Sequence, residues 1–196
     1  ILNNLGCQSV HVDVCQGFAF PGFFSLDDVQ SGSLHVFNGH VTMHFFRPQL
    51  GDCQIDLSFL RENDLAVLHV FPDTNVDSVS EFFEAVQLAG CRPGISLDIK
   101  IDFSVIKPYL PSLDTVFVMG IPVATYGLQM EQSTLVRLAS MSQLIAKCNL
   151  HCRLGLDGGV NTTTFRQLIA LVDELVVGGL LFYTDDIVAQ WAALTA

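Results

Sequence analysis

Polar side chains of a kind that binds metal ions follow apolar, strand-like stretches at several separate places. The set comprises His11, Asp13, His44, His69, Asp98 and Asp157. His11 and Asp13 alternate with valines, so an extended chain points both of them to one face. Two imidazoles and two carboxylates, from His11, Asp13, His44 and Asp157, suit Zn²⁺, Fe²⁺, Mn²⁺ or Co²⁺. No local motif joins these groups, so only the fold can bring them together.

The turn that begins at Asp157 is the second candidate for chemistry. An apolar run over residues 150–156 ends in Asp157, Gly158 and Gly159, and a helical pattern starts at residue 165. Paired glycines let backbone N–H groups approach a ligand closely, and a helix N-terminus favours an anion. Asp157 can therefore do chemistry while the two glycines hold a phosphate. The alternative is that Asp157 merely caps the helix that follows.

Strand-like and helical patterns alternate along the whole chain. Strands are expected at residues 9–14, 41–46, 65–71, 94–101, 115–121, 150–156 and 174–177. Helices are expected at residues 25–29, 76–88, 103–110, 132–148, 165–172 and 185–194. This order predicts an α/β fold with a parallel sheet and one domain over residues 1–196. A closed (β/α)8 TIM barrel needs eight strands, so we expect its first strand to lie outside this sequence.

Composition narrows the classes of partner. The 196 residues carry a net charge of −11 with only nine Lys and Arg, which argues against nucleic acids and anionic membranes. An anionic substrate would have to be captured by local N–H groups or a metal ion. No apolar run is long enough to span a bilayer, and the six cysteines include no CxxC pair. We expect a cytoplasmic protein with reduced thiols, and weigh Cys148, His151 and Cys152 as a zinc site only as an alternative.

Several segments resemble ribulose-phosphate 3-epimerases. Residues 11–17 resemble the family's H-x-D-V-M-D-G segment, and residues 156–161 are similar to its V-D-G-G-V-N. Weaker likenesses are found at residues 41–46, 113–119 and 175–182. The resemblance runs in order along the whole chain. It does not include the family's first strand or most of its first helix. It implies a (β/α)8 barrel, a homo-oligomer and a divalent metal held by His11, Asp13, His44 and Asp157.

The resemblance also implies an activity, the epimerisation of a phosphorylated ketose beside its carbonyl group. Asp13 and Asp157 would act as the two acid/base groups on opposite faces of a flat enediolate. The implied contacts with substrate and phosphate are Met119, Gly127, Gly158, Gly159, Gly178 and Gly179. The chain departs from the family pattern at Cys15, Gln16 and Phe46, at residues 69–71, and at residues 123–128, which keep only one glycine.

These departures leave other functions open. The substrate can be D-ribulose 5-phosphate or a related phosphosugar such as allulose 6-phosphate. The chain can also be a catalytically degenerate barrel that serves as a binding or assembly subunit. A third alternative is a sugar-phosphate decarboxylase, since residues 98–102 approach a D-x-K-x-x-D motif but are one residue short.

Overall fold

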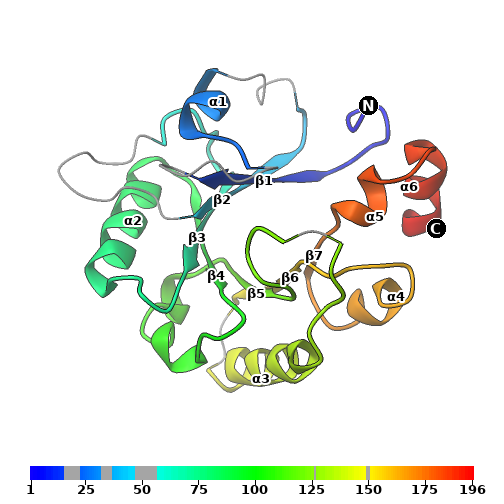
Figure 1. Ribbon diagram of the computed structural model, residues 1–196. Coiled ribbons are helices and arrows are strands. Elements are labelled where there is room, and N and C mark those ends of the chain that lie inside the picture. The colour runs from blue at the N-terminus through cyan, green and yellow to red at the C-terminus, as the bar shows by residue number, and fades with distance from the viewer. Residues whose placement is uncertain (16–22, 32–36, 47–56, 126, 149–150) are drawn as a thin grey trace.

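The computed structural model describes residues 1–15, 23–31, 37–46, 57–125, 127–148 and 151–196. Within these residues, seven parallel strands follow one another in chain order and curve into a nearly closed barrel (Figure 1). The strands are β1 Ser9–Cys15, β2 His40–Phe46, β3 Leu65–Val70, β4 Arg92–Leu97, β5 Thr115–Met119, β6 Arg153–Asp157 and β7 Glu174–Val176. The predicted parallel barrel of the TIM type is therefore confirmed.

Helices surround the sheet on its outer side (Figure 1). They are α1 Leu26–Ser31, α2 Val76–Leu88, α3 Ser133–Lys147, α4 Phe165–Leu168, α5 Gly179–Phe182 and α6 Ile187–Thr195. The helix α2 matches the predicted range because its ends are marked: Asn75 accepts a hydrogen bond from the backbone N–H of Asp77, and Gly90 takes a φ of 69° after the last turn. None of the described helices has the length and apolar character needed to cross a membrane.

Alternation along the strands sorts side chains into two apolar groups. The larger core lies under the helices and includes Met43, Leu68 and Val118. A separate small cluster contains Leu65, Val67 and Phe117, which occupy the alternate positions and so fill the barrel interior. Inward-facing positions nearer the C-terminal ends of the strands include the polar residues His44, His69 and Asp157.

Glycine makes space for the interior packing. A Cβ atom at Gly155 would overlap the ring of Phe117, whose side chain on the neighbouring strand is fully buried. Near the N-terminal ends of the strands, the Glu174 carboxylate lies 3.4 Å from the Thr42 hydroxyl and 3.4 Å from the Arg153 guanidinium. These contacts tie β7 to β2 across the interior and to its neighbour β6.

Several predicted boundaries were wrong. The helix expected at residues 103–110 is replaced by two 3₁₀ turns, Phe103–Val105 and Leu110–Ser112, because Pro108 and Pro111 remove backbone donors. The strand expected over residues 94–101 ends at Leu97. The helix expected at residues 165–172 stops at residue 168, and α5 was not anticipated.

Candidate metal centre

Three strands supply the four predicted metal ligands. His11 and Asp13 lie on β1, His44 lies on β2, and Asp157 is the last residue of β6. Parallel pairing places Asp13 directly opposite His44, so their side chains emerge at the same level of the barrel. The four residues thus meet inside the barrel although residues 13 and 157 are far apart in sequence.

The four facing atoms are spaced as a metal ion requires. His11 Nε2 lies 3.2 Å from His44 Nδ1. Both nitrogens lie 3.3 Å from Asp13 Oδ1, and they lie 3.7 and 3.5 Å from Asp157 Oδ2. Tetrahedral ligands about 2.0–2.1 Å from a cation are separated from one another by roughly 3.3 Å. The observed distances are close to this value.

One buried oxygen supports the fit independently of the spacing. Asp13 Oδ1 is shielded from solvent and has no hydrogen-bond partner among the described residues. An unpaired buried carboxylate oxygen is costly, and a cation between the four residues would satisfy it. His44 is fully buried and the side chain of His11 is 11% exposed, whereas the carboxylates of Asp13 and Asp157 remain partly accessible. The donor set and its surroundings therefore fit a divalent cation.

Electrostatics at the site favour a positive charge. Burial of the His11 ring lowers its pKa, but the nearby carboxylates of Asp13 and Asp157 outweigh burial, so the pKa of His11 is raised. Burial raises the pKa of Asp13, but His11 and His44 outweigh it, so the pKa of Asp13 is lowered. The same field that attracts a proton to His11 would attract a metal ion.

A third histidine lies next to His44. His69, on β3, places its Nδ1 atom 3.2 Å from His44 Nε2, and its Nε2 atom lies 3.9 Å from Asp98 Oδ2. Burial lowers the pKa of His69 to about 4, so its ring is neutral at physiological pH. The sequence placed His69 and Asp98 at strand ends without a role, and the structure brings them next to the candidate ligands.

The double glycine after Asp157 has a packing reason of its own. Gly158 and Gly159 adopt φ angles of 95° and 76°, and Cβ atoms there would lie 2.5 Å from Ile121 and 2.7 Å from Met130. Only glycine fits such close approaches at positive φ. These two residues are therefore required by the turn whether or not they bind phosphate.

The capping alternative for Asp157 is not what the structure shows. The Asn161 side chain accepts hydrogen bonds from the backbone N–H groups of Thr163 and Thr164, just before α4. The carboxylate of Asp157 faces the two imidazoles instead.

The remaining predicted contact residues lie on neighbouring connections. Met119 ends β5, pairs with Asp157 and is buried. Gly127 is exposed in the connection from β5 to α3, with a φ of 69°. Gly178 and Gly179 are exposed where α5 begins after β7. Gln16, which departs from the family pattern, lies outside the described residues.

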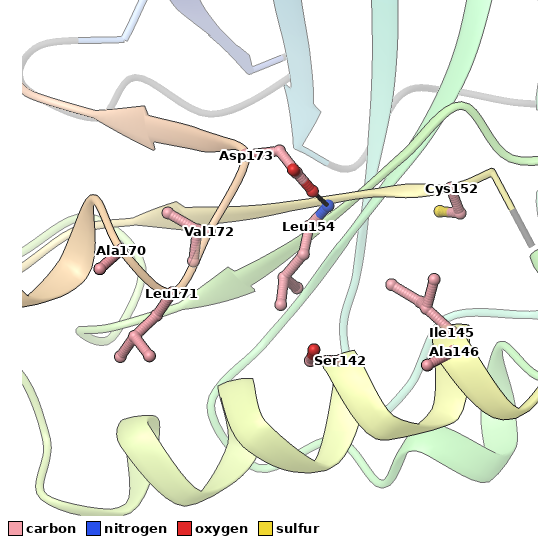
Figure 2. Close-up of a pocket in the computed structure, with 9 residues that line it drawn as sticks. All are labelled: Ser142, Ile145, Ala146, Cys152, Leu154, Ala170, Leu171, Val172 and Asp173. Carbon is pink, nitrogen blue, oxygen red and sulfur yellow. Dashed lines mark hydrogen bonds between the residues drawn. The ribbon is translucent and has the colours of Figure 1, made fainter.

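A separate hollow lies outside the sheet, between α3 and the segment that leads into β7 (Figure 2). It is lined by Ser142, Ile145, Ala146, Cys152, Leu154, Ala170, Leu171, Val172 and Asp173. It shares no residue with the four candidate ligands. Over the described part of the chain, the four candidate ligands are the one group with metal-binding composition and spacing. The alternative zinc site at Cys148, His151 and Cys152 is therefore not formed.

Comparison with known proteins decides the family. The profile of the Ribulose-phosphate 3 epimerase family matches residues 1–182. The chain belongs to the ribulose-phosphate 3-epimerase family. The resemblance seen in the sequence motifs is thereby confirmed, and the chain is a member of a family of isomerases that act as epimerases.

Curated relatives support this assignment at low identity. The ribulose-phosphate 3-epimerase of Helicobacter pylori is 26% identical over 188 residues, which cover 90% of this chain and 80% of the relative. That of Treponema pallidum is 23% identical over 187 residues, covering 93% and 82%. A solved structure of 3-hexulose-6-phosphate synthase from Salmonella typhimurium aligns with a TM-score of 0.54 over 79% of this chain and 72% of that one. Its identity is 13%, so it shows the barrel fold alone.

Proposed function

We propose that this ribulose-phosphate 3-epimerase family member is a metal-dependent 3-epimerase of a ketose phosphate. The substrate would be D-ribulose 5-phosphate, converted to D-xylulose 5-phosphate, or a related phosphosugar such as allulose 6-phosphate. The observation that carries this proposal is the convergence of His11, Asp13, His44 and Asp157, whose facing atoms are 3.2–3.7 Å apart in the five measured pairs. Family membership supports the class of reaction, and it leads us to propose a cytoplasmic homo-oligomer.

The four converging side chains would hold Zn²⁺, Fe²⁺, Mn²⁺ or Co²⁺, which all accept mixed nitrogen and oxygen ligands. When bound, such an ion acts as a Lewis acid that stabilises negative charge developing on the substrate oxygens. His11 and His44 would serve as neutral ligands, and the two carboxylates would balance the charge of the ion.

The two aspartates would carry out proton transfer. Epimerisation next to a ketone removes a proton from one face of a carbon and returns a proton to the other face. Asp13 and Asp157 project from different strands, β1 and β6, and each directs one oxygen at the imidazoles. Their other oxygens, Oδ2 of Asp13 and Oδ1 of Asp157, would be the groups that take and give the proton.

The phosphate would bind to backbone N–H groups beyond the strand ends. Gly158, Gly159, Gly178 and Gly179 follow β6 and β7, and Gly127 follows β5. With a net charge of −11, the protein has no general attraction for an anion, so such local donors would have to capture it. Met119 would line the sugar pocket beside Asp157.

The test combines metal analysis with an epimerase assay on both ketose phosphates. We expect one divalent ion per chain and turnover of at least one substrate. His44→Ala should lower the metal content, whereas His40→Ala, an exposed histidine at the start of the same strand, should not. A protein that holds its metal but epimerises neither sugar would be the degenerate binding barrel instead.

Calorimetry tests the phosphate contacts separately. A phosphorylated ketose should bind, and the same sugar without its phosphate should not bind measurably. Equal affinity for the two forms would remove the glycine N–H groups from the binding site.

A further inference from the structure

His44 meets a polar neighbour on each side of its ring. Its Nδ1 atom faces Asp13, Asp157 and His11 in the candidate metal centre, and its Nε2 atom lies 3.2 Å from His69 Nδ1. A neutral imidazole carries one N–H, and a nitrogen that binds a metal must be free of its proton. With Nδ1 as the ligand atom, the proton of His44 must reside on Nε2 and be donated to His69.

That donation fixes the state of His69 in turn. If His69 accepts at Nδ1, its own proton must be on Nε2, and that atom is buried without a hydrogen-bond partner among the described residues. The carboxylate of Asp98 faces it, with Oδ2 at 3.9 Å. The order of donation therefore runs from His44 to His69 and then toward Asp98.

Asp98 is held firmly enough to end this chain of contacts. It follows β4, and its Oδ1 atom accepts a hydrogen bond of 3.1 Å from the backbone N–H of Lys100. The guanidinium of Arg137, on α3, donates to the backbone oxygens of Asp98 and Ile101 at 3.1 and 2.8 Å. One carboxylate oxygen is thus fixed by the turn, and the other is left facing His69.

Aromatic rings enclose His69. Phe46 stacks on it with ring centroids 4.7 Å apart and an interplanar angle of 26°. The ring centroid of Phe71 lies 4.4 Å from that of His69. The His69 side chain is fully buried. Water cannot readily replace His69 as the partner of His44, so the contact between the two rings is set by the protein.

We propose that His69 and Asp98 are positioning residues that fix the tautomer and the orientation of His44 as a metal ligand. In this relay, His44 Nε2–H donates to His69 Nδ1, and the Nε2–H of His69 faces the carboxylate of Asp98 at 3.9 Å, as an electrostatic contact. Partners of this kind raise the basicity of a ligating imidazole and hold its ring in place, and their loss typically weakens metal binding by about 10- to 100-fold. This inference rests on the proposed metal centre.

The experiment measures Co²⁺ binding by competition and by the visible absorption spectrum of the bound ion. His69→Leu removes the acceptor at similar volume, and His69→Asn restores an amide oxygen near the place of Nδ1. Asp98→Asn removes the charge at the end of the relay. Ser96→Ala is the matched control, because Ser96 lies opposite His69 in the register, is fully buried and has no hydrogen-bond partner among the described residues.

We expect His69→Leu to weaken Co²⁺ binding by about 10- to 100-fold and to change the spectrum. His69→Asn should recover most of the affinity, Asp98→Asn should show a smaller loss, and Ser96→Ala should bind like the wild type. Wild-type affinity in His69→Leu, or equal losses in His69→Leu and His69→Asn, would overturn the relay. If His69→Leu does not fold, unchanged affinity and spectrum in Asp98→Asn overturn it. Failure of the wild type to bind Co²⁺ would instead refute the metal centre itself.

Discussion

Asp13 and Asp157 carry the same functional group but differ in their exposure to solvent and in the strand that positions them. The side chain of Asp13 is 30% exposed and lies on the same strand as His11, whereas that of Asp157 is 14% exposed and ends β6. Placed on separate strands, the two carboxylates can approach a flat substrate from different sides. In the proposed mechanism, each would serve one face of the carbon that is epimerised.

The first prediction concerns Asp157→Asn. Asn has nearly the same shape, so the variant should fold, but its amide cannot exchange a proton. Epimerisation should fall by about 10²- to 10⁴-fold, the usual contribution of a positioned acid/base group. Exchange of the substrate proton with deuterated solvent, followed by NMR, should persist on the face served by Asp13.

The control is Asp185→Asn, which alters an exposed carboxylate between α5 and α6 and should keep the wild-type rate. Epimerisation at the wild-type rate by Asp157→Asn would exclude Asp157 from proton transfer.

For individual residues, the sequence was informative where the geometry of a strand alone decides to which face a side chain points. Alternation with valines places His11 and Asp13 on one face, and the motif after residue 156 singles out Asp157. The contact between His44 and His69 could not be predicted, because it depends on how two rings on neighbouring strands are rotated. The double glycine was expected to serve a ligand, yet its close approaches to Ile121 and Met130 show a packing role that only the folded chain reveals.

The neighbouring strands β5 and β6 pack in the interior because a glycine on one leaves space for an aromatic ring on the other. The ring of Phe117 fills the space above Gly155 and also contacts His11, with ring centroids 5.6 Å apart. The packing of these two strands thus supports the lower side of the candidate metal centre.

The second prediction is that Gly155→Ala destabilises the protein. The added methyl group would overlap the Phe117 ring, and overpacking of this kind typically costs about 1–3 kcal/mol. Gly155→Ala with Phe117→Leu should lose less stability than the sum of the two single changes, because the smaller side chain makes room. Denaturant unfolding of the four proteins measures this coupling.

Gly178→Ala serves as the comparison. Gly178 has a φ of −97°, and a methyl group added there would meet no atom within 4 Å, so its replacement should change stability little. A similar loss in both alanine variants would contradict the packing explanation.

Element boundaries followed the sequence only where local signals were strong. Residues 76–88 were correct because Asn75 and Gly90 mark both ends of an amphipathic helix. The strand predicted over residues 94–101 was too long, because the chain turns at Asp98. The Asp98 side chain accepts a hydrogen bond from the Lys100 N–H, and the Asp98 carbonyl oxygen accepts one from the Ile101 N–H. The short helix α5 had no periodic pattern to reveal it.

Across the whole molecule, the thiols differ in their surroundings. Cys91 and Cys152 are buried, and burial raises the pKa of each to about 11. Cys148 is exposed after α3. Since the thiolate is the reactive form, a pKa near 11 leaves only about one thiol in a thousand ionised at pH 8.

The third prediction is therefore an order of alkylation. Iodoacetamide at pH 8 should modify Cys148 well before Cys91 and Cys152, as followed by peptide mass spectrometry. In denaturant the three should react at similar rates, because burial is lost. Early modification of Cys91 in the native protein would show that its surroundings open readily.

The last prediction follows from the charge of the whole chain. Twenty Asp and Glu against nine Lys and Arg give a net charge of −11, and a sugar phosphate carries about −1.5 to −2 at pH 7. The overall field therefore repels the proposed substrate, and capture would depend on the proposed metal ion and on N–H groups at the strand ends. Raising potassium chloride from about 10 to 150 mM shortens the Debye length from roughly 30 to 8 Å.

Screening should remove more of the long-range repulsion than of the short contacts inside the site. We therefore expect kcat/KM for the ketose phosphate to rise several-fold over this range, the reverse of an enzyme with a basic surface. Sucrose at the same osmolarity should leave kcat/KM unchanged, and the metal content should be equal at both salt concentrations. A steady fall in kcat/KM with salt would show that a local positive surface, rather than the net charge, governs how the substrate arrives.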